Sequence, residues 1–251
     1  MFWPTPWTAS TRVFARQMAW LQRHVELVTL AEAQRRIATG VNERPCVHVT
    51  FDDGYADNLD FAIPLLVERG IPCTYFVASQ FVARQCPFPH DVACNAPLRP
   101  NSPEQLRRMA AWGIEIGAHT RTHADLGRIG DADQLIQEIV GSRQELESMV
   151  GRPVHYFAFP YGQQRNLNQQ AFAVARQHGL LGACSAYGGY NFPGDEPFHI
   201  QRIHADNQML TFKNWLTFDP RKHRSIQRYW VAPESAVQQL EPQSAGEVAS
   251  L

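Results

Sequence analysis

Two adjacent carboxylates are the first residues of this sequence whose types and spacing could perform chemistry. Asp52 and Asp53 follow the apolar run CVHVTF at 46–51, which ends abruptly in Asp-Asp-Gly-Tyr. Neighbouring carboxylates at the end of a buried strand repel each other unless a positive group lies beside them, and a metal ion is such a group. The alternative is a simple turn, because Asp-Asp-Gly-Tyr also has good turn chemistry.

A pair of histidines forms the second candidate. His119 and His123 give an HxxxH spacing directly after the apolar run IEIGA at 114–118. If this segment is helical, a spacing of four places both imidazoles on one face. Two neutral imidazoles and one carboxylate make an open three-ligand metal site with a position left for water. Taken alone, such a pair is also typical of surface or capping histidines.

The third candidate is the segment FAFPYG at 157–162. Its apolar run stops at Pro160, so that Tyr161 and its backbone N–H are presented beside a glycine. Pro-Tyr-Gly alone is an ordinary turn. Its position at a third predicted strand end makes it a candidate part of the same site.

Strands that alternate with helices must position these residues. We predict strands at 46–51, 73–79, 114–118 and 156–160, an apolar run at 180–187, and helices at 57–69, 103–112, 132–149 and 167–178, after helical spacing in 11–38 that stops at Gly40. This order predicts an α/β fold with a parallel sheet, closed as a distorted (β/α) barrel, with the site at the carboxyl ends of the strands. The proline-rich segment 84–103 is predicted to be a long loop beside the site.

The domain organisation follows from the same pattern. We predict an N-terminal helical lead-in at 1–44, a catalytic domain at 45–231 and a disordered tail at 232–251, where few large apolar residues occur. A chain of 251 residues with 44% hydrophobic content suits one main core.

Composition and charge exclude several classes of protein. The net charge of −1 argues against the broad basic face of a nucleic-acid-binding protein. No apolar run is long enough for a membrane span, and the N-terminus lacks the pattern of a secretory signal. The sequence as it stands predicts a cytoplasmic protein, or a periplasmic or cell-envelope protein if the N-terminus is truncated. Five cysteines without a CxxC pair do not form a zinc ribbon.

Three segments together resemble the polysaccharide deacetylase family, also called the NodB homology domain or carbohydrate esterase family four. They are VTFDDGYADNLDFAIPLLVERGIPCTYFVAS, EIGAHTRTHADL and FAFPYG, in the family's order, and the resemblance covers roughly residues 45–205. It implies a NodB-like fold, metal ligation by Asp53, His119 and His123, and Asp52 as the general base. Zn²⁺ is the expected metal for this ligand set, with Co²⁺, Ni²⁺ or Mn²⁺ as alternatives.

The resemblance also implies an activity. It is the metal-dependent hydrolysis of N-acetyl groups on an amino-sugar polymer that contains N-acetylglucosamine, so the expected partner is a carbohydrate substrate. A divalent metal lowers the pKa of a water molecule and Asp52 takes its proton, while the backbone N–H of Tyr161 stabilises the tetrahedral oxyanion. Pro160 and Tyr161 are expected to line the sugar groove. The alternatives are a hydrolase of small cyclic amides on the same scaffold and a degenerate carbohydrate-binding module.

Two positions depart from the family pattern. Many members carry an arginine in the third motif that orients the catalytic aspartate, and the aligned residue here is Ala158. Arg202 is our candidate for that role and for the substrate-binding set, since a guanidinium can hold a carboxylate through two hydrogen bonds. The alternative is an arginine on a solvated strand edge. For the general acid we predict His204, which shares a face with Arg202 if the strand is regular, and His90 is a second candidate.

Overall fold

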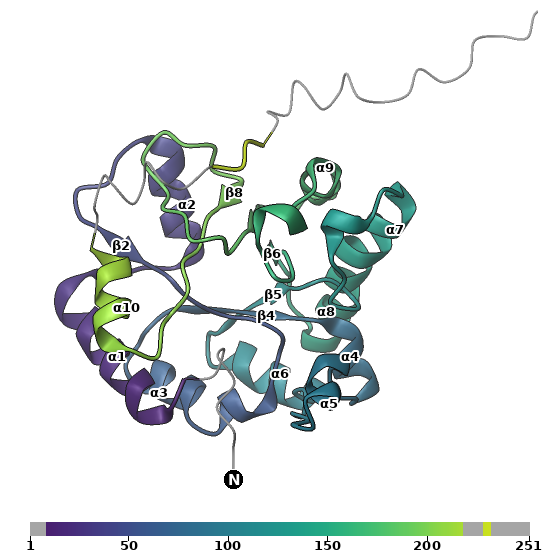
Figure 1. Cartoon of the computed structure of the whole chain (residues 1–251), viewed down its shortest axis with the longest axis horizontal. Coiled ribbons are helices and arrows are strands. Elements are labelled where there is room, and N and C mark those ends of the chain that lie inside the picture. The colour runs from purple at the N-terminus through teal and green to yellow at the C-terminus, as the bar shows by residue number, and fades with distance from the viewer. Residues whose placement is uncertain (1–8, 218–227, 232–251) are drawn as a thin grey trace, which may run out of the picture.

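The computed structural model describes residues 9–217 and 228–231, and it is built on a six-stranded parallel sheet (Figure 1). The strands are β3 (Val49–Phe51), β4 (Cys73–Val77), β5 (Glu115–Ala118), β6 (Tyr156–Ala158), β7 (Gly182–Cys184) and β8 (His199–Ile200). They pair in chain order, and all five pairings are parallel. The predicted parallel α/β architecture is therefore confirmed.

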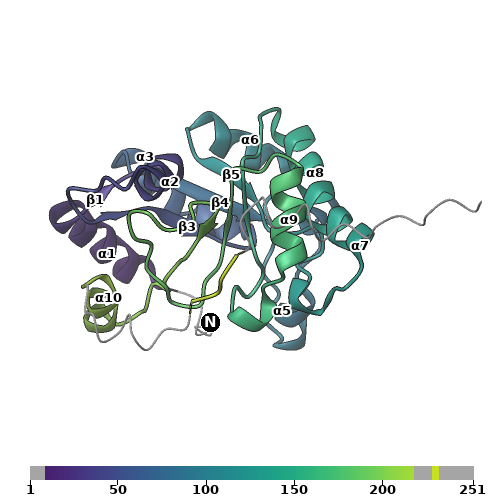
Figure 2. The same ribbon diagram turned by 90° about the horizontal axis from the view of Figure 1, so that it is seen from above.

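The sheet is curled, and its two edge strands, β3 and β8, do not pair with each other (Figures 1 and 2). The barrel is consequently a half-barrel. Helices pack on the outside of the curl, where α6 and α8 contact β5 and α9 contacts β7. The helices are α1 (Thr11–His24), α2 (Leu30–Thr39), α3 (Ala62–Glu68), α4 (Ser79–Arg84), α5 (Pro89–Ala93), α6 (Pro103–Ala111), α7 (Ala132–Ile136), α8 (Ser142–Val150), α9 (Gln169–Gln177) and α10 (Met209–Leu216).

The first two helices confirm the helical spacing predicted near the N-terminus. Ser10 caps α1, Thr29 caps α2, and α2 ends at Gly40, which has the left-handed φ of 72° that favours glycine. The apolar face of α1 packs into the main core through Phe14, Met18 and Leu21. The predicted tail at 232–251 lies outside the described residues.

The predicted strand at 46–51 is interrupted at His48. Its first part, β2 (Cys46–Val47), pairs with β1 (Glu26–Leu27) in a separate two-stranded parallel sheet, and β3 starts after the interruption. The chain changes pairing partner here, from β1 to β4, and the His48 ring contacts both sides, with its Nδ1 2.8 Å from the Val28 carbonyl oxygen and its Nε2 2.8 Å from Thr74 Oγ1. A long-range contact thus overrides the β propensity of the run.

Two further elements differ from the sequence prediction. The segment 84–103 was predicted to contain no element, but it forms α5, with Pro89 at the first helical position that proline favours. The helix predicted at 132–149 is divided by a π-helical turn, Gln137–Gly141, between α7 and α8. Such turns commonly occur near functional sites.

The core has two layers because successive strand residues point to opposite faces of the sheet. On the outer face Tyr75, Val77 and Phe157 belong to the main core beneath the helices. On the inner face Phe76 and Tyr156 form a smaller core with Leu30 of α2. All five cysteines are free. Among the described helices none is both long and apolar enough to cross a membrane.

Candidate metal centre

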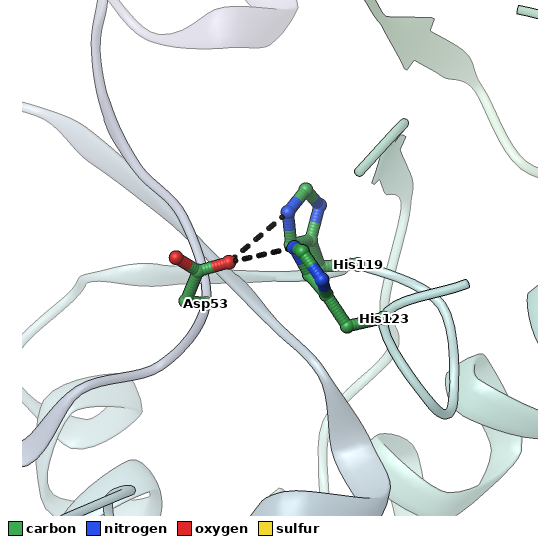
Figure 3. Close-up of side chains that lie close together, drawn as sticks. All are labelled: Asp53, His119 and His123. Atoms are coloured by element: carbon green, nitrogen blue, oxygen red, sulfur yellow. Dashed lines mark ion pairs between the residues drawn. The ribbon is translucent and has the colours of Figure 1, made fainter. Parts of the chain in front are cut away.

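Asp53, His119 and His123 converge at the carboxyl ends of β3 and β5 (Figure 3). The Nε2 atoms of His123 and His119 lie 3.1 Å and 3.4 Å from Asp53 Oδ1. One ligand atom from each residue lies within 4.8 Å of the other two, and within residues 9–217 and 228–231 this is the only such group of metal-ligating side chains. The two motifs predicted to form one site do come together.

The hydrogen bond made by His119 assigns its tautomer. Its Nδ1 lies 2.8 Å from the carbonyl oxygen of Ala158, and a carbonyl can only accept, so Nδ1 carries the hydrogen. In the neutral ring Nε2 is then an acceptor that faces the Asp53 carboxylate, another acceptor. A divalent metal between them would resolve this, since it fits two imidazole nitrogens and one carboxylate.

The charges at the centre shift the pKa values of its members. Burial would raise the pKa of Asp53, but hydrogen bonds with His119 and His123 outweigh burial and lower it. Burial would lower the pKa of His119, but the negative charges of Asp52 and Asp53 outweigh it and raise the pKa. For His123 burial has the larger effect, and its pKa is lowered. The carboxylate is therefore ionised, as metal ligation requires.

The segment that joins the two histidines is not helical. Thr120 and His123 both have a φ of 57°, so the imidazoles meet through a left-handed loop, and the helical interpretation of HxxxH is wrong. Six non-glycine residues of the described chain have positive φ, and four of them lie at this site, namely Thr120, His123, Asp53 and Tyr161. Unfavourable backbone conformations that collect at one place are typical of functional sites.

Asp52 is held by Arg202. The Nη1–Oδ1 and Nη2–Oδ2 distances are 2.7 Å and 2.9 Å, and the guanidinium also donates to Thr50 Oγ1 and to the Ser185 carbonyl oxygen. Burial would raise the pKa of Asp52, but the charge of Arg202 outweighs it and lowers the pKa. The Arg202 side chain is only 11% exposed, so it is a buried partner of Asp52 and not a residue on a solvated strand edge. Its contact with substrate stays a prediction.

The Pro160–Tyr161–Gly162 turn lies beside the histidines. The ring of Tyr161 is 55% exposed and meets the His123 ring edge-on, with 4.9 Å between the ring centroids. Pro160 is buried, and its contact with sugar stays a prediction. Gly162 has a φ of 60°, and a Cβ there would lie 2.6 Å from the Ala186 backbone nitrogen. The turn therefore requires glycine at this position.

The predicted acid, His204, lies beyond β8. The strand ends at Ile200, so the strand alternation that would place His204 on the face of Arg202 does not apply. Partial desolvation and the positive charge of Arg202 lower the pKa of His204, against the opposing effect of Asp52. It thus lies within electrostatic reach of the carboxylate.

The second candidate, His90, lies next to the metal centre on α5. Its ring centroid is 5.9 Å from that of His123, and its Nε2 lies 3.1 Å from the Tyr55 hydroxyl. That hydroxyl donates to Asp91 Oδ2 at 2.8 Å. The 84–103 segment therefore lies beside the site, as predicted. Sequence reasoning missed Tyr55 and Asp91, although Tyr55 directly follows the Asp-Asp-Gly motif and could have been singled out from it.

Comparison with known proteins assigns the family. The model of the polysaccharide deacetylase family matches residues 39–183, which is more than half of the chain. The chain belongs to the polysaccharide deacetylase family. Among curated proteins, a chitooligosaccharide deacetylase from Bradyrhizobium sp. (strain ANU 289) is 31% identical over 135 residues, which cover 52% of each protein. The chain spans about half the length of the curated relatives it matches.

Solved structures of other polysaccharide deacetylases and related proteins share the fold. IcaB from Ammonifex degensii superposes with a TM-score of 0.70 at 24% identity, covering 86% of this chain and 92% of that one. A de-N-acetylase from Aggregatibacter actinomycetemcomitans gives a TM-score of 0.68 at 21% identity, with the same coverage. The distorted NodB-like barrel predicted from the three motifs is therefore confirmed.

Proposed function

We propose that this polysaccharide deacetylase family member is a metal-dependent hydrolase that removes N-acetyl groups from a polymer containing N-acetylglucosamine. The observation that carries the proposal is the arrangement of the two adjacent aspartates. Asp53 faces the two histidines, whereas Asp52 turns away from them to Arg202. One carboxylate is thus a ligand and its neighbour is a separate, oriented base, as amide hydrolysis requires.

Asp53, His119 and His123 would hold the metal, which we propose to be Zn²⁺, with Co²⁺, Ni²⁺ or Mn²⁺ as alternatives for the same ligands. When bound, the metal would lower the pKa of water and polarise the carbonyl of the acetamide. The Ala158 carbonyl keeps the His119 ring in the tautomer that presents Nε2. This one ligand is thus oriented by the protein before a metal binds.

The remaining steps belong to side chains and backbone of this chain. Asp52, ionised and held by Arg202, would accept the proton of the attacking water. The backbone N–H of Tyr161 has no acceptor among the described residues, and it lies on an exposed turn. It would stabilise the negative oxygen that forms on the amide carbon.

A proton must also reach the leaving amine. We propose His204 as the donor, with His90 as the second candidate because its half-exposed side chain lies beside His123. The two are distinguished by single variants. If His204 is the donor, His204→Ala should lower kcat by about 10²-fold or more, the size of a typical acid–base contribution, while His90→Ala leaves most of kcat. The reverse result would transfer the role to His90.

Two observations support an amino-sugar polymer as the substrate. Relatives named chitooligosaccharide deacetylase match this chain at 31% and 30% identity. The exposed ring of Tyr161 at the edge of the metal centre suits an open groove better than the closed pocket that a small cyclic amide would need. Aromatic rings of this kind offer an apolar face with a polar tip.

The test measures bound metal by elemental analysis and acetate released from N-acetylglucosamine oligomers. We expect the wild type to hold about one metal per chain and to release acetate, and Asp52→Asn to keep the metal but lose at least about 10²-fold in rate. Asp133→Asn, which changes an exposed carboxylate on α7, is the matched control and should behave as wild type. Metal without acetate release from the wild type would contradict the proposed activity.

A further inference from the structure

The loop between the two histidine ligands needs support from outside itself. Thr120 and His123 adopt left-handed φ values of 57°, and the segment contains no glycine to make that conformation easy. A β-branched residue such as Thr120 is especially unfavourable there. The Thr120 hydroxyl accepts the Ala124 N–H at 3.0 Å from within the segment, and contacts with the rest of the protein add to it in holding the loop and His123.

Glu138 binds the backbone of this loop. Its Oε2 accepts the N–H groups of Arg121 and Thr122, at 3.0 Å and 2.9 Å, and its Oε1 accepts the Thr122 hydroxyl at 2.7 Å. The carboxylate is 7% exposed, and no cationic side chain of the described residues forms an ion pair with it. Its charge is stabilised by the donors of the loop, and charge-assisted hydrogen bonds of this kind are strong.

The π-helical turn presents Glu138 to the loop. Glu138 lies in the turn Gln137–Gly141, and Ser142 follows four residues later, on the same side of the helix. The Ser142 hydroxyl donates to the Thr120 carbonyl oxygen at 2.9 Å. The unusual turn thus has a specific consequence, because it brings one acceptor and one donor to the same loop.

The opposite side of the loop is held by the beginning of α4. The N–H groups of Ser79 and Gln80 donate to the carbonyl oxygens of Thr120 and Arg121, at 3.3 Å and 3.0 Å. The loop carbonyls are therefore bound by backbone donors and by Ser142, whereas the amides of Arg121 and Thr122 are bound by the carboxylate of Glu138. No other group among the described residues accepts these two amides.

We propose that Glu138 is a positioning residue that holds the histidine loop in its left-handed form and thereby sets the affinity of the metal centre. The inference rests on the proposed metal site. Among the described residues Glu138 forms no hydrogen bond with His119 or His123, and it acts through the backbone of Arg121 and Thr122. Partners that orient ligands in this way typically change metal affinity 10- to 100-fold when they are altered, so we expect roughly that effect here.

The test is Glu138→Gln, which keeps the size of the side chain but replaces one acceptor oxygen by a donor. We expect Zn²⁺ affinity, measured by competition with a chelator, to fall about 10- to 100-fold. In metal-free protein the amides of Arg121 and Thr122 should exchange hydrogen faster. Glu147→Gln is the matched control, because Glu147 on α8 accepts the Val154 N–H at 3.0 Å and pairs with Arg143, away from the loop. Its Zn²⁺ affinity should stay within about twofold of wild type, since it leaves the loop contacts intact.

The outcomes separate this inference from the proposed function. Unchanged affinity and unchanged amide exchange in Glu138→Gln would overturn the role of Glu138 while leaving the metal site intact. A wild type that binds no Zn²⁺, Co²⁺, Ni²⁺ or Mn²⁺ would contradict the proposed function and, with it, the effect on affinity. If Glu138→Gln does not fold, Thr122→Val removes only the hydroxyl donor to Oε1. A several-fold loss of affinity in that variant is expected, and no loss would overturn the inference.

Discussion

Arg202 and Asp52 join the two edges of the curled sheet through a bidentate ion pair. Asp52 follows β3 and Arg202 follows β8, and these edge strands share no backbone hydrogen bonds. The pair, with distances of 2.7 Å and 2.9 Å, thus bridges the open side of the half-barrel at the edge where the metal centre lies. A contact that orients the proposed base also holds the two edges together.

This relationship predicts different results for two substitutions of Arg202. Arg202→Ala leaves the partly buried Asp52 carboxylate unpaired and should lower the free energy of unfolding by about 1.5–3 kcal/mol. Arg202→Lys keeps the charge but cannot make two parallel hydrogen bonds, so it should fold and lose activity through misplacement of Asp52. Urea unfolding and acetate release measure the two effects. The exposed pair Arg35–Glu32 is the control, and Arg35→Lys should change neither quantity.

Metal removal should destabilise the protein. A ligand that binds only the folded state at about 100 times its Kd adds about 2.7 kcal/mol to the free energy of unfolding. We therefore expect a chelator to lower the Tm of the wild type, and Zn²⁺ to restore it. His123→Ala should abolish this response, whereas His24→Ala, at an exposed position on α1, should retain it. A chelator response that persists in His123→Ala would contradict the ligand assignment.

Gly162 should tolerate no side chain. In Gly162→Ala the new Cβ would meet the Ala186 backbone nitrogen at 2.6 Å, in addition to the cost of a left-handed φ of 60°. Gly40→Ala has a comparable φ of 72° but open space around the Cβ, so it should cost only about 1 kcal/mol. We expect Gly162→Ala to lose more stability than Gly40→Ala and to lose acetate release as Tyr161 moves. Equal losses of stability in the two variants would contradict this prediction, because they would show that the Ala186 backbone moves away from the new Cβ without a cost in free energy.

His48 should make stability depend on pH. Burial lowers the pKa of His48 to about 4, from about 6.5 in the unfolded chain. Between these values the unfolded chain binds a proton that the folded protein does not. The free energy of unfolding therefore falls as the pH falls through this window. The loss caused by His48 approaches about 3 kcal/mol below pH 4. Urea unfolding at several pH values should show a shallower decrease in His48→Gln, and an unchanged slope would contradict the assignment.

Local patterns in the sequence were sufficient to predict the architecture and to predict that the motifs lie close together. Apolar runs that alternate with helical spacing predicted the parallel sheet, because both periods are local properties of the chain. Asp53 and His119 each follow the end of a strand, and the carboxyl ends of parallel strands share one edge, so their proximity was predictable.

The helices within 11–38 and the helix stop at Gly40 were predictable for the same reason, since capping and periodicity act over a few residues. The interruption at His48 was not, because it depends on hydrogen bonds to Val28 and Thr74 that are distant in sequence. The π-helical turn at Gln137–Gly141 gave no local signal either, and its consequence lies in the loop that Glu138 binds.

The sequence by itself therefore determined the family, the order of the elements and which residue types meet at the sheet's edge, because these depend on short-range patterns. Only the tertiary structure decided how the residues meet. It showed the left-handed loop between the histidines, since an HxxxH spacing is equally compatible with a helix. It also decided between the two alternatives that the sequence left open for Arg202, because the contact with Asp52 across 150 residues depends on how far the sheet curls, which no local pattern encodes.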